Sequence, residues 1–567
     1  MHRTKIIATL GPAVSSLSTM KSLIKAGCDI ARINTAHGDL EEYKNLIELF
    51  RKASKEVGKT TGILLDIKGP EIRTGDFEQG YIELKEGQEL ILTPEPILGN
   101  SEKIHINTNI APYIRPLDII LIDDGKIELK VIKIEGSNVI TKVIRGGQIK
   151  SRRGVNIPGR NIETPYLTKR DKEAIKFAVE NEIDFIAASF TRSSSDIYEI
   201  RQEIFRLGSC IPIIAKIENK SGIRRINDIL IVADAIMVAR GDLGVELRVE
   251  QVPAAQKHLL KQAKKQAKPA IIATQILESM VENPTPTRAE VSDIANAILD
   301  GADALMLSEE TAIGKHPIEA VKMLDRTAKA AEVMLFRHKK FSELNGGISH
   351  NISNAAILLT KQVHARAIVC VTRSGKTARL ISRHKPQAPI IVATYSPKVL
   401  RQITILWGAT GFVIEKGETT DEVIEKTMEE ALKRGLIRRK DVLVVSASDP
   451  SGIPGTTNVI RVHIMGSIIG RGTAFGTAHV CGYVVLDPNY NKDSGQNTIL
   501  VIETMPSLET ILNFDAVIID SHCYDPAILK KAAKKGVVIM AGVRGIIKKV
   551  KEGEILNVDP ERGVIWR

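Results

Sequence analysis

The residues best suited to chemistry are charged and hydroxyl side chains that come directly after short apolar runs. Lys216 and Glu218 follow one run, Asp242 follows the next and Thr274 the one after that. Glu218 and Asp242 could share a hard divalent cation, because Mg²⁺ takes one or two carboxylates and completes its shell with substrate oxygens and water. With Lys216 beside them, the set favours phosphoryl transfer, which needs positive charge around the phosphoryl oxygens. Gly241 would let a substrate carboxylate approach backbone N–H groups, with the Thr274 hydroxyl opposite.

Other candidates follow further runs of the same kind. Arg32 and Arg73 would clamp the migrating group together with Lys216, which shares one face of an extended strand with Glu218. A single charged residue after a strand is usually part of a solvated turn. Charged or hydroxyl groups after six of eight runs are hard to explain by solvation alone. The remaining groups in such positions are Asp66, Ser308, Glu310 and Thr311.

The apolar runs indicate which elements position these groups. They are nearly continuous, as expected of parallel strands buried on both faces, and helix-patterned stretches such as 40–55, 169–181 and 254–268 lie between them. Eight strands with helical crossovers predict a (β/α)8 TIM barrel, in which catalytic groups lie at the carboxyl ends of the strands. The expected strands are 4–10, 29–33, 62–66, 184–189, 211–216, 235–239, 270–273 and 304–307.

The pattern changes at three places along the chain. After the third strand, apolar and polar residues alternate between glycine turns, which predicts an inserted all-β domain that could act as a lid. Strand and helix patterns then alternate again beyond the barrel, and a glycine-rich junction precedes a last mixed segment. We therefore expect an α/β protein of four domains: a catalytic barrel over 1–74 and 166–346, a β-barrel lid over 75–165, an α/β effector-type domain over 347–466 and a mixed α/β extension over 467–567.

Composition sets the broad class. The chain has 567 residues, 43% hydrophobic and 26% charged, which is ordinary for a globular protein. Its net charge of +12 admits a nucleic-acid partner, but only 4% of residues are aromatic, so we expect none and attribute the charge to an enzyme of anionic substrates. No apolar run is long enough for a membrane helix, and five scattered cysteines without a CxxC pair favour neither disulfides nor structural zinc. A cytoplasmic protein without a membrane partner is expected.

A separate loop follows the first strand of the effector-type domain. Its hydroxyls, backbone N–H groups and lysine at a helix start could bind an anion, whereas the simpler interpretation is a helix N-cap. The loop is not a Walker A motif, because Cys370 stands where that motif requires a glycine. Its candidate residues are Thr372, Ser374, Gly375, Lys376 and Thr377.

Taken together, the motifs resemble the pyruvate kinase family over residues 1–466. The stretches that carry the resemblance are TKIIATLGPA (4–13), AGCDIARINTAHG (26–38), LLDIKGPEIRTG (64–75), GVNIPG (154–159), KIEN (216–219), DAIMVARGDLGVE (234–246), ATQILESM (273–280) and PTRAEVSDIANAILDGADALMLSEET (286–311). The resemblance implies transfer of the phosphoryl group of phosphoenolpyruvate to ADP, giving ATP and pyruvate, in the last step of glycolysis. It also implies a homotetramer, as is common in the family, and a sugar-phosphate or nucleotide effector bound at the 372–377 loop.

The resemblance also implies roles for individual residues. Glu218 and Asp242 match the ligands of Mg²⁺ or Mn²⁺, and Lys216 matches the lysine that neutralises the phosphoryl group in flight. The substrate carboxylate would lie at Gly241, Asp242 and Thr274. Thr274, Ser308 and Glu310 would form the network that delivers the proton. The groups implied on the phosphate and nucleotide side are Arg32, Asn34, His37 and Arg73, with Arg153 approaching from the lid.

Two departures from the family pattern leave questions open. The resemblance implies a K⁺ site at Asn34, Asp66 and Ile67, but Ala36 replaces the serine that normally supplies a further ligand, so K⁺ dependence is in doubt. The last hundred residues resemble the phosphohistidine mobile domain of phosphoenolpyruvate-utilising enzymes. Asp525 stands where that domain has its histidine, so a structural or regulatory role is expected there. The alternative to an active kinase is a catalytically silent sugar-phosphate- or nucleic-acid-binding protein on the same fold.

Overall fold

A computed structural model describes residues 2–36, 38–160, 162, 165–338, 346–447, 457–466, 468–490 and 496–567. The chain forms two compact units, one of residues 1–430 and 444–461 and the other of residues 431–443 and 462–567. No helix in the described residues is both long and apolar enough to cross a membrane.

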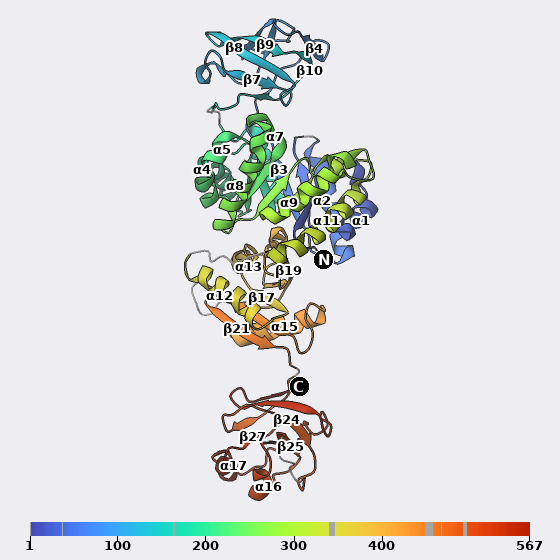
Figure 1. Ribbon diagram of the computed structural model, residues 1–567, viewed down its shortest axis with the longest axis vertical. Coiled ribbons are helices and arrows are strands. Elements are labelled where there is room, and N and C mark those ends of the chain that lie inside the picture. The colour runs from blue at the N-terminus through green and yellow to red at the C-terminus, as the bar shows by residue number, and fades with distance from the viewer. Residues whose placement is uncertain are drawn as a thin grey trace. The chain divides into compact units, whose positions relative to one another are not determined.

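A closed barrel of eight parallel strands is the centre of the first unit (Figure 1). The strands pair in the order β1-β16-β15-β14-β13-β12-β3-β2, which confirms the predicted TIM barrel. Nearly all their residues are buried, because one face packs inside the barrel and the other against helices. The barrel strands are β1 (Lys5–Thr9), β2 (Ile30–Asn34), β3 (Gly62–Ile67), β12 (Phe185–Ala188), β13 (Ile213–Ile217), β14 (Ala235–Ala239), β15 (Ala270–Ala273) and β16 (Ala304–Leu307).

The helices between these strands present apolar stripes to the barrel and begin at capping residues. Thr168 caps α3 by accepting a hydrogen bond from the backbone N–H of Asp171, whose carboxylate accepts the N–H of Thr168 in return. The helices of this region are α1 (Leu17–Ala26), α2 (Leu40–Val57), α3 (Lys169–Glu180), α4 (Ser194–Arg206), α5 (Lys220–Arg224), α6 (Ile226–Val232), α7 (Arg240–Glu246), α8 (Val252–Lys265), α9 (Arg288–Asp300), α10 (Glu309–Ala312) and α11 (Pro317–His338). Short 3-10 helices occur at η1 (Pro12–Val14), η3 (Val249–Gln251) and η4 (Glu278–Val281).

The inserted segment after β3 is all-β apart from η2 (Ala111–Tyr113). Its strands form a six-stranded sheet, β11-β7-β8-β9-β5-β6, and a separate pair, β10-β4. The described strands pair as two sheets, and bridges from Arg73 to Gly154 and from Thr74 to Ile106 connect the two edges of the six-stranded sheet. The β-barrel expected for 75–165 stays a prediction. The β8–β9 pairing shifts register twice. The strands are β4 (Tyr81–Leu84), β5 (Glu89–Thr93), β6 (Lys103–His105), β7 (Ile119–Ile122), β8 (Ile127–Glu135), β9 (Asn138–Arg145), β10 (Gly147–Lys150) and β11 (Val155–Asn156).

A five-stranded sheet follows the barrel in the order β19-β18-β17-β20-β21. Its buried residues share one hydrophobic cluster with inward-facing residues of the barrel strands, such as Ile7 and Leu64. The elements are α12 (Ile348–Gln362), β17 (Ala367–Val371), α13 (Lys376–Ser382), β18 (Ile390–Thr394), α14 (Pro397–Gln402), η5 (Ile403–Ile405), β19 (Ala409–Val413), α15 (Thr420–Lys433), β20 (Val442–Ala447) and β21 (Val459–Ile464).

The second unit contains an eight-stranded mixed sheet in the order β22-β29-β28-β24-β25-β26-β27-β23. Parallel strands β24 to β27 form its centre, and two hydrophobic clusters are built from residues between Ile469 and Ile565. Its elements are β22 (Ile468–Arg471), β23 (Thr473–Phe475), β24 (Val480–Val485), β25 (Thr498–Ile502), α16 (Leu508–Leu512), β26 (Ala516–Ile519), α17 (Pro526–Ala533), β27 (Val538–Ala541), β28 (Ile555–Asp559) and β29 (Val564–Trp566).

Candidate active site

Lys216 is the centre of a charged cluster at the carboxyl ends of the barrel strands. Its ammonium lies 2.9 Å from Glu218 Oε1 and 3.3 Å from Asp66 Oδ1, and it donates a hydrogen bond of 2.8 Å to Ser189 Oγ. Burial alone would lower the pKa of Lys216, but the carboxylates of Asp66 and Glu218 outweigh it and raise that pKa. Lys216 is therefore a permanent cation rather than a base.

Two further carboxylates belong to this end of the barrel: Glu218, directly after β13, and Asp242, in α7 after β14. Glu218 is 1% exposed, and its Oε2 accepts a hydrogen bond of 2.5 Å from the backbone N–H of Phe190. Burial and the nearby Glu218 carboxylate raise the pKa of Asp242 to about 7. Two carboxylates that disfavour each other's ionised form can gain from a cation placed between them.

Arg32 and Asp66 form a buried ion pair next to Lys216. The Arg32 guanidinium donates through Nε to Asp66 Oδ2 at 2.9 Å, its Nη2 lies 2.7 Å from the same oxygen, and its Nη1 donates to Thr9 Oγ1 at 3.1 Å. Ser189 Oγ donates to Asp66 Oδ1 at 3.1 Å. Both carboxylate oxygens of Asp66 are thus occupied by donors of the chain itself.

The other residues implied for K⁺ are also engaged or buried. Asn34 Oδ1 accepts a hydrogen bond of 3.2 Å from the backbone N–H of Ala36, and Ile67 is fully buried. With the Asp66 oxygens held by Arg32, Lys216 and Ser189, these residues do not fit a K⁺ ion without rearrangement.

Thr274 and Gly241 meet across neighbouring strand ends. The Gly241 N–H donates to Thr274 Oγ1 at 2.9 Å, and Thr274 and Gln275 both have positive φ angles, 66° and 54°. Arg240 Nη2 donates 2.8 Å bonds to the carbonyl oxygens of both residues, and its Nη1 donates to Asp293 Oδ2 at 2.5 Å. This guanidinium holds a strained turn in place, so that the Thr274 hydroxyl faces Gly241.

Ser308 and Glu310 begin the turn after β16. The Glu310 carboxylate accepts the backbone N–H groups of Leu277 at 3.0 Å and Ser308 at 2.6 Å, and burial raises its pKa. Glu310 therefore joins the turns after β15 and β16, which is a structural role alongside the proton-network role implied by the sequence.

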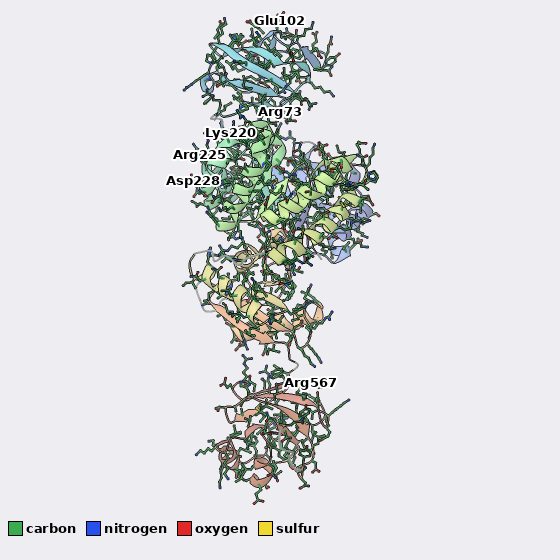
Figure 2. All side chains as sticks on the ribbon, viewed as in Figure 1. Arg73, Glu102, Lys220, Arg225, Asp228 and Arg567 are labelled. Atoms are coloured by element: carbon green, nitrogen blue, oxygen red, sulfur yellow. The ribbon has the colours of Figure 1, made fainter. Side chains whose placement is uncertain are left out.

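Arg73 and Arg153 lie away from the Lys216 cluster, at the connection to the inserted domain. Arg73, one of the side chains labelled in Figure 2, donates through Nε to Glu71 Oε2 at 2.7 Å and through Nη1 to the carbonyl of Arg152. Arg73 also pairs as an isolated bridge with Gly154. Arg153 Nη1 lies 3.6 Å from Asp123. His37 lies outside the described residues.

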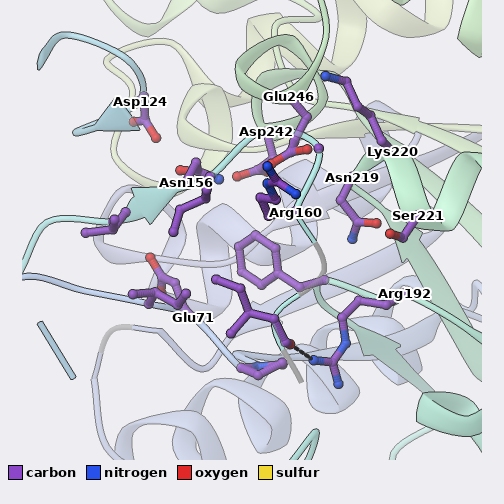
Figure 3. Close-up of a pocket in the computed structure, with 18 of the residues that line it drawn as sticks. Glu71, Asp124, Asn156, Arg160, Arg192, Asn219, Lys220, Ser221, Asp242 and Glu246 are labelled. Atoms are coloured by element: carbon purple, nitrogen blue, oxygen red, sulfur yellow. Dashed lines mark hydrogen bonds between the residues drawn. The ribbon is translucent and has the colours of Figure 1, made fainter. Parts of the chain in front are cut away.

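A cavity of about 140 Å³ opens between Asp242 and the inserted domain. Asp242 and Glu246 of α7 lie on one wall with Asn219, Lys220 and Ser221, and Figure 3 shows Arg192 hydrogen-bonded to the carbonyl of Ile162. Both acidic and basic side chains line the cavity, so it offers contacts to anions and to cations.

Ser189 and Phe190 were not expected at the site, because the expected strand 184–189 included Ser189 as its last residue, whereas β12 ends at Ala188. They follow β12, the one strand between the two ends that bear Asp66 and Lys216. The strand order of a closed parallel barrel could have identified them, because all carboxyl ends lie on one rim and the end of β12 lies between those of β3 and β13.

The 372–377 loop joins β17 to α13. The Gly375 N–H donates to Thr372 Oγ1 at 3.0 Å, and Gly375 caps α13 with a positive φ of 77°. Thr377 is buried with its hydroxyl 2.5 Å from that of Thr457, whereas Ser374 and Lys376 are exposed. The loop thus combines a fixed backbone with exposed polar side chains.

The closed parallel barrel, with its charged cluster at the carboxyl ends of the strands, defines an α/β-barrel enzyme. Residues 1–321 match the family model for the barrel domain of pyruvate kinase, and residues 350–463 match the model for its alpha/beta domain. The chain belongs to the pyruvate kinase family, and its function is that of a glycolytic phosphotransferase, transferring a phosphoryl group between phosphoenolpyruvate and ADP.

Individual relatives agree with this assignment. A pyruvate kinase of Bacillus licheniformis is 38% identical over 583 aligned residues, covering 100% of this chain and 99% of the relative. One of Geobacillus stearothermophilus is 38% identical over 582 residues with the same coverage. A crystal structure of a pyruvate kinase from Cryptosporidium parvum is 34% identical with a TM-score of 0.76, covering 82% of this chain and 96% of that one.

Proposed function

We propose that the Lys216 cluster is the place where the phosphoryl group of phosphoenolpyruvate passes to ADP. The bond from phosphorus to the enol oxygen breaks, a terminal oxygen of ADP bonds to phosphorus, and the remaining enolate takes a proton at its methylene carbon to become pyruvate. The observation that supports this most directly is the Lys216 ammonium held between Asp66 and Glu218.

Each remaining group has a part in this reaction. Lys216 would neutralise charge on the phosphoryl oxygens, and Arg32, fixed by Asp66, would bind the same oxygens. The Gly241 N–H and the Thr274 hydroxyl would orient the substrate carboxylate. Ser308 and Glu310 would support the proton network, and Arg73, Arg153 and His37 the nucleotide side.

Glu218 and Asp242 would hold a divalent cation once the Glu218 oxygens turn away from Lys216 Nζ and the Phe190 N–H, which they contact in the structure. Among the described residues, no group of three or more His, Cys, Asp and Glu side chains is arranged to hold a metal, so a pair of carboxylates is what the chain offers at this site. Oxygen donors of this kind suit Mg²⁺ or Mn²⁺, with substrate oxygens and water completing the shell. When bound, the cation would supply Lewis-acid stabilisation of the phosphoryl and carboxylate oxygens.

The test of the site is pyruvate formation from phosphoenolpyruvate, ADP and Mg²⁺ by the full chain and by Lys216→Met. We expect the variant to lose about 10³-fold or more in kcat, because a buried cation aimed at developing charge is removed. Lys169→Met, which removes an exposed lysine at the start of α3, is the matched control and should keep the parental rate. A Lys216→Met rate close to that of the parent would remove the site assignment.

We propose further that the reaction does not require K⁺. The Asp66 oxygens are held by Arg32, Lys216 and Ser189, and Ala36 offers no hydroxyl ligand. We expect similar rates of pyruvate formation with Mg²⁺ in K⁺-free buffer and after addition of K⁺. Activity that appears only with K⁺ would mean that Asn34 and Asp66 rearrange to bind it.

The regulatory and cellular assignments rest on the resemblance. We propose that the 372–377 loop binds the phosphate of a sugar-phosphate or nucleotide effector, since its backbone is fixed and Ser374 and Lys376 are exposed. A homotetramer in the cytoplasm and the four-domain division with boundaries at 74, 165, 346 and 466 complete the proposal. The segment 467–567 would serve a structural or regulatory role, because Asp525 caps α17 by accepting the N–H of Ala527.

A further inference from the structure

Ser189 follows β12 and contacts Lys216, and the proposed phosphoryl transfer assigns it no role. It is 4% exposed, and its hydroxyl accepts from Lys216 Nζ at 2.8 Å while donating to Asp66 Oδ1 at 3.1 Å. An ammonium has three N–H groups. In Lys216 they face Ser189, Asp66 and Glu218, so the serine supplies the one uncharged contact that sets the direction of the ammonium between two carboxylates.

The backbone of Ser189 is itself fixed from two sides. Tyr166, 1% exposed, donates its hydroxyl to the Ser189 carbonyl oxygen at 2.5 Å. Gly69 has a φ of +70°, and a Cβ at that position would lie 2.7 Å from the same oxygen, so only glycine allows this approach. Gly69 and Tyr166 lie where the chain leaves the barrel for the inserted domain and where it returns.

The residue after Ser189 extends the same arrangement. Phe190 has a positive φ of 55°, which is uncommon for a bulky residue, and its N–H donates to Glu218 Oε2. Ser189 and Phe190 therefore hold Lys216 and Glu218 at once, one through a side chain and the other through the backbone.

We propose that Ser189 is a positioning residue for phosphoryl transfer: its hydroxyl orients the Lys216 ammonium, and Tyr166 and Gly69 fix Ser189 from the two connections to the inserted domain. Ser189 acts through Lys216 and forms no bond to the transferred group. A change at either connection would thereby reach the reacting groups through one buried carbonyl. This inference rests on the proposed role of Lys216.

The first test is Ser189→Ala in the full chain. We expect kcat to fall about 10- to 100-fold, because small misplacement of a reacting group is costly, while KM for phosphoenolpyruvate changes little. Ser189→Thr keeps the hydroxyl and should recover most of the loss. A crystal structure of Ser189→Ala should show Lys216 Nζ moved away from Asp66, which a purely structural serine would not cause.

Two further variants separate this role from general packing. Tyr166→Phe keeps the ring but releases the Ser189 carbonyl, and we expect kcat to fall about 2- to 10-fold, the range of one hydrogen bond. Thr360→Val removes a buried hydroxyl of α12, which donates to the Ala356 carbonyl at 2.6 Å far from the Lys216 cluster in the sequence, and should leave kcat near the parental value.

The outcomes distinguish the two proposals. An inactive parent chain would defeat the proposed function before any variant is compared. An active parent with Ser189→Ala at the same kcat, or with Lys216 unmoved in the variant crystal, would overturn the positioning role alone. Equal losses in Ser189→Ala and Thr360→Val would also overturn it, because loss of any buried hydroxyl would then explain both.

Discussion

At the scale of single residues, the site is governed by buried charges that fix one another's ionisation. Burial would raise the pKa of Asp66, but Lys216 and Arg32 outweigh it and lower that pKa. Asp66 is 2% exposed and stays ionised, so it can hold two cations ready for a substrate that brings its own negative charge. Asp242 differs from Asp66, because burial and the Glu218 carboxylate raise its pKa instead of lowering it.

The raised pKa of Asp242 gives a pH-dependent metal affinity. Below its pKa of about 7 the carboxyl is protonated, because burial and Glu218 disfavour the anion, and a divalent cation must displace that proton. We expect the affinity of the substrate-free protein for Mn²⁺ to fall about tenfold per pH unit between pH 7 and pH 5, and to level off above pH 8. Titration calorimetry or the electron paramagnetic resonance signal of free Mn²⁺ measures this.

The control for this prediction is Asp242→Asn. The amide carries no charge at any of these pH values, so the variant should bind Mn²⁺ weakly with a much flatter pH dependence. Equal Mn²⁺ affinity of the parent at pH 5.5 and pH 7.5 would contradict the assignment of Asp242 as the titrating ligand.

At the scale of elements, the barrel was predictable and part of its rim was not. Parallel strands buried on both faces leave continuous apolar runs, so β13, which contains Lys216, and β14 and β15, which precede Asp242 and Thr274, could be placed from the sequence. The end of β12 was missed because the expected strand 184–189 included Ser189, and the role of Ser189 comes from its contacts with Asp66 and Lys216. Closure of the sheet in the inserted domain stays a prediction, because alternation reveals strands but not which edges pair.

A second buried cluster ties the segment before β1 to β2 and α11. The ring nitrogens of His2 lie 3.0 Å from Asp29 Oδ2 and 2.5 Å from Asp325 Oδ1. Burial lowers the pKa of His2, but these two hydrogen bonds and the charge of Asp29 outweigh both burial and nearby Lys5, and raise it. The charged imidazole thus joins two carboxylates that come from distant parts of the chain.

This cluster makes the stability of the fold depend on pH. A group whose pKa rises on folding contributes stability that is fully present below its unfolded pKa, near 6.5, and is lost as pH rises through the folded pKa. We expect His2→Gln to lower the free energy of unfolding by about 1–2 kcal/mol at pH 6 and by less at pH 9. Urea unfolding at the two pH values measures it, and an equal loss at both would show that His2 acts by packing alone.

At the scale of the whole molecule, the groups assigned to chemistry all precede residue 312, whereas the last hundred residues build hydrophobic clusters of their own. The pyruvate kinase from Cryptosporidium parvum matches 82% of this chain over 96% of its own length. The segment 467–567 thus supplies none of the groups assigned to the reaction.

A chain that ends at Gly466 tests this separation. We expect it to keep kcat and KM for phosphoenolpyruvate within about threefold of the full chain, because a domain with its own core can be removed without disturbing another. Residues 431–443 and 462–466 of the second unit stay in the shortened chain and lose neighbours there, so thermal unfolding of the shortened chain should begin at a lower temperature. Circular dichroism and the pyruvate assay measure both effects, with Lys216→Met in the shortened chain as the inactive control. A soluble, folded but inactive product would show that the extension acts on the barrel site, which makes it part of the catalytic machinery rather than an appended unit.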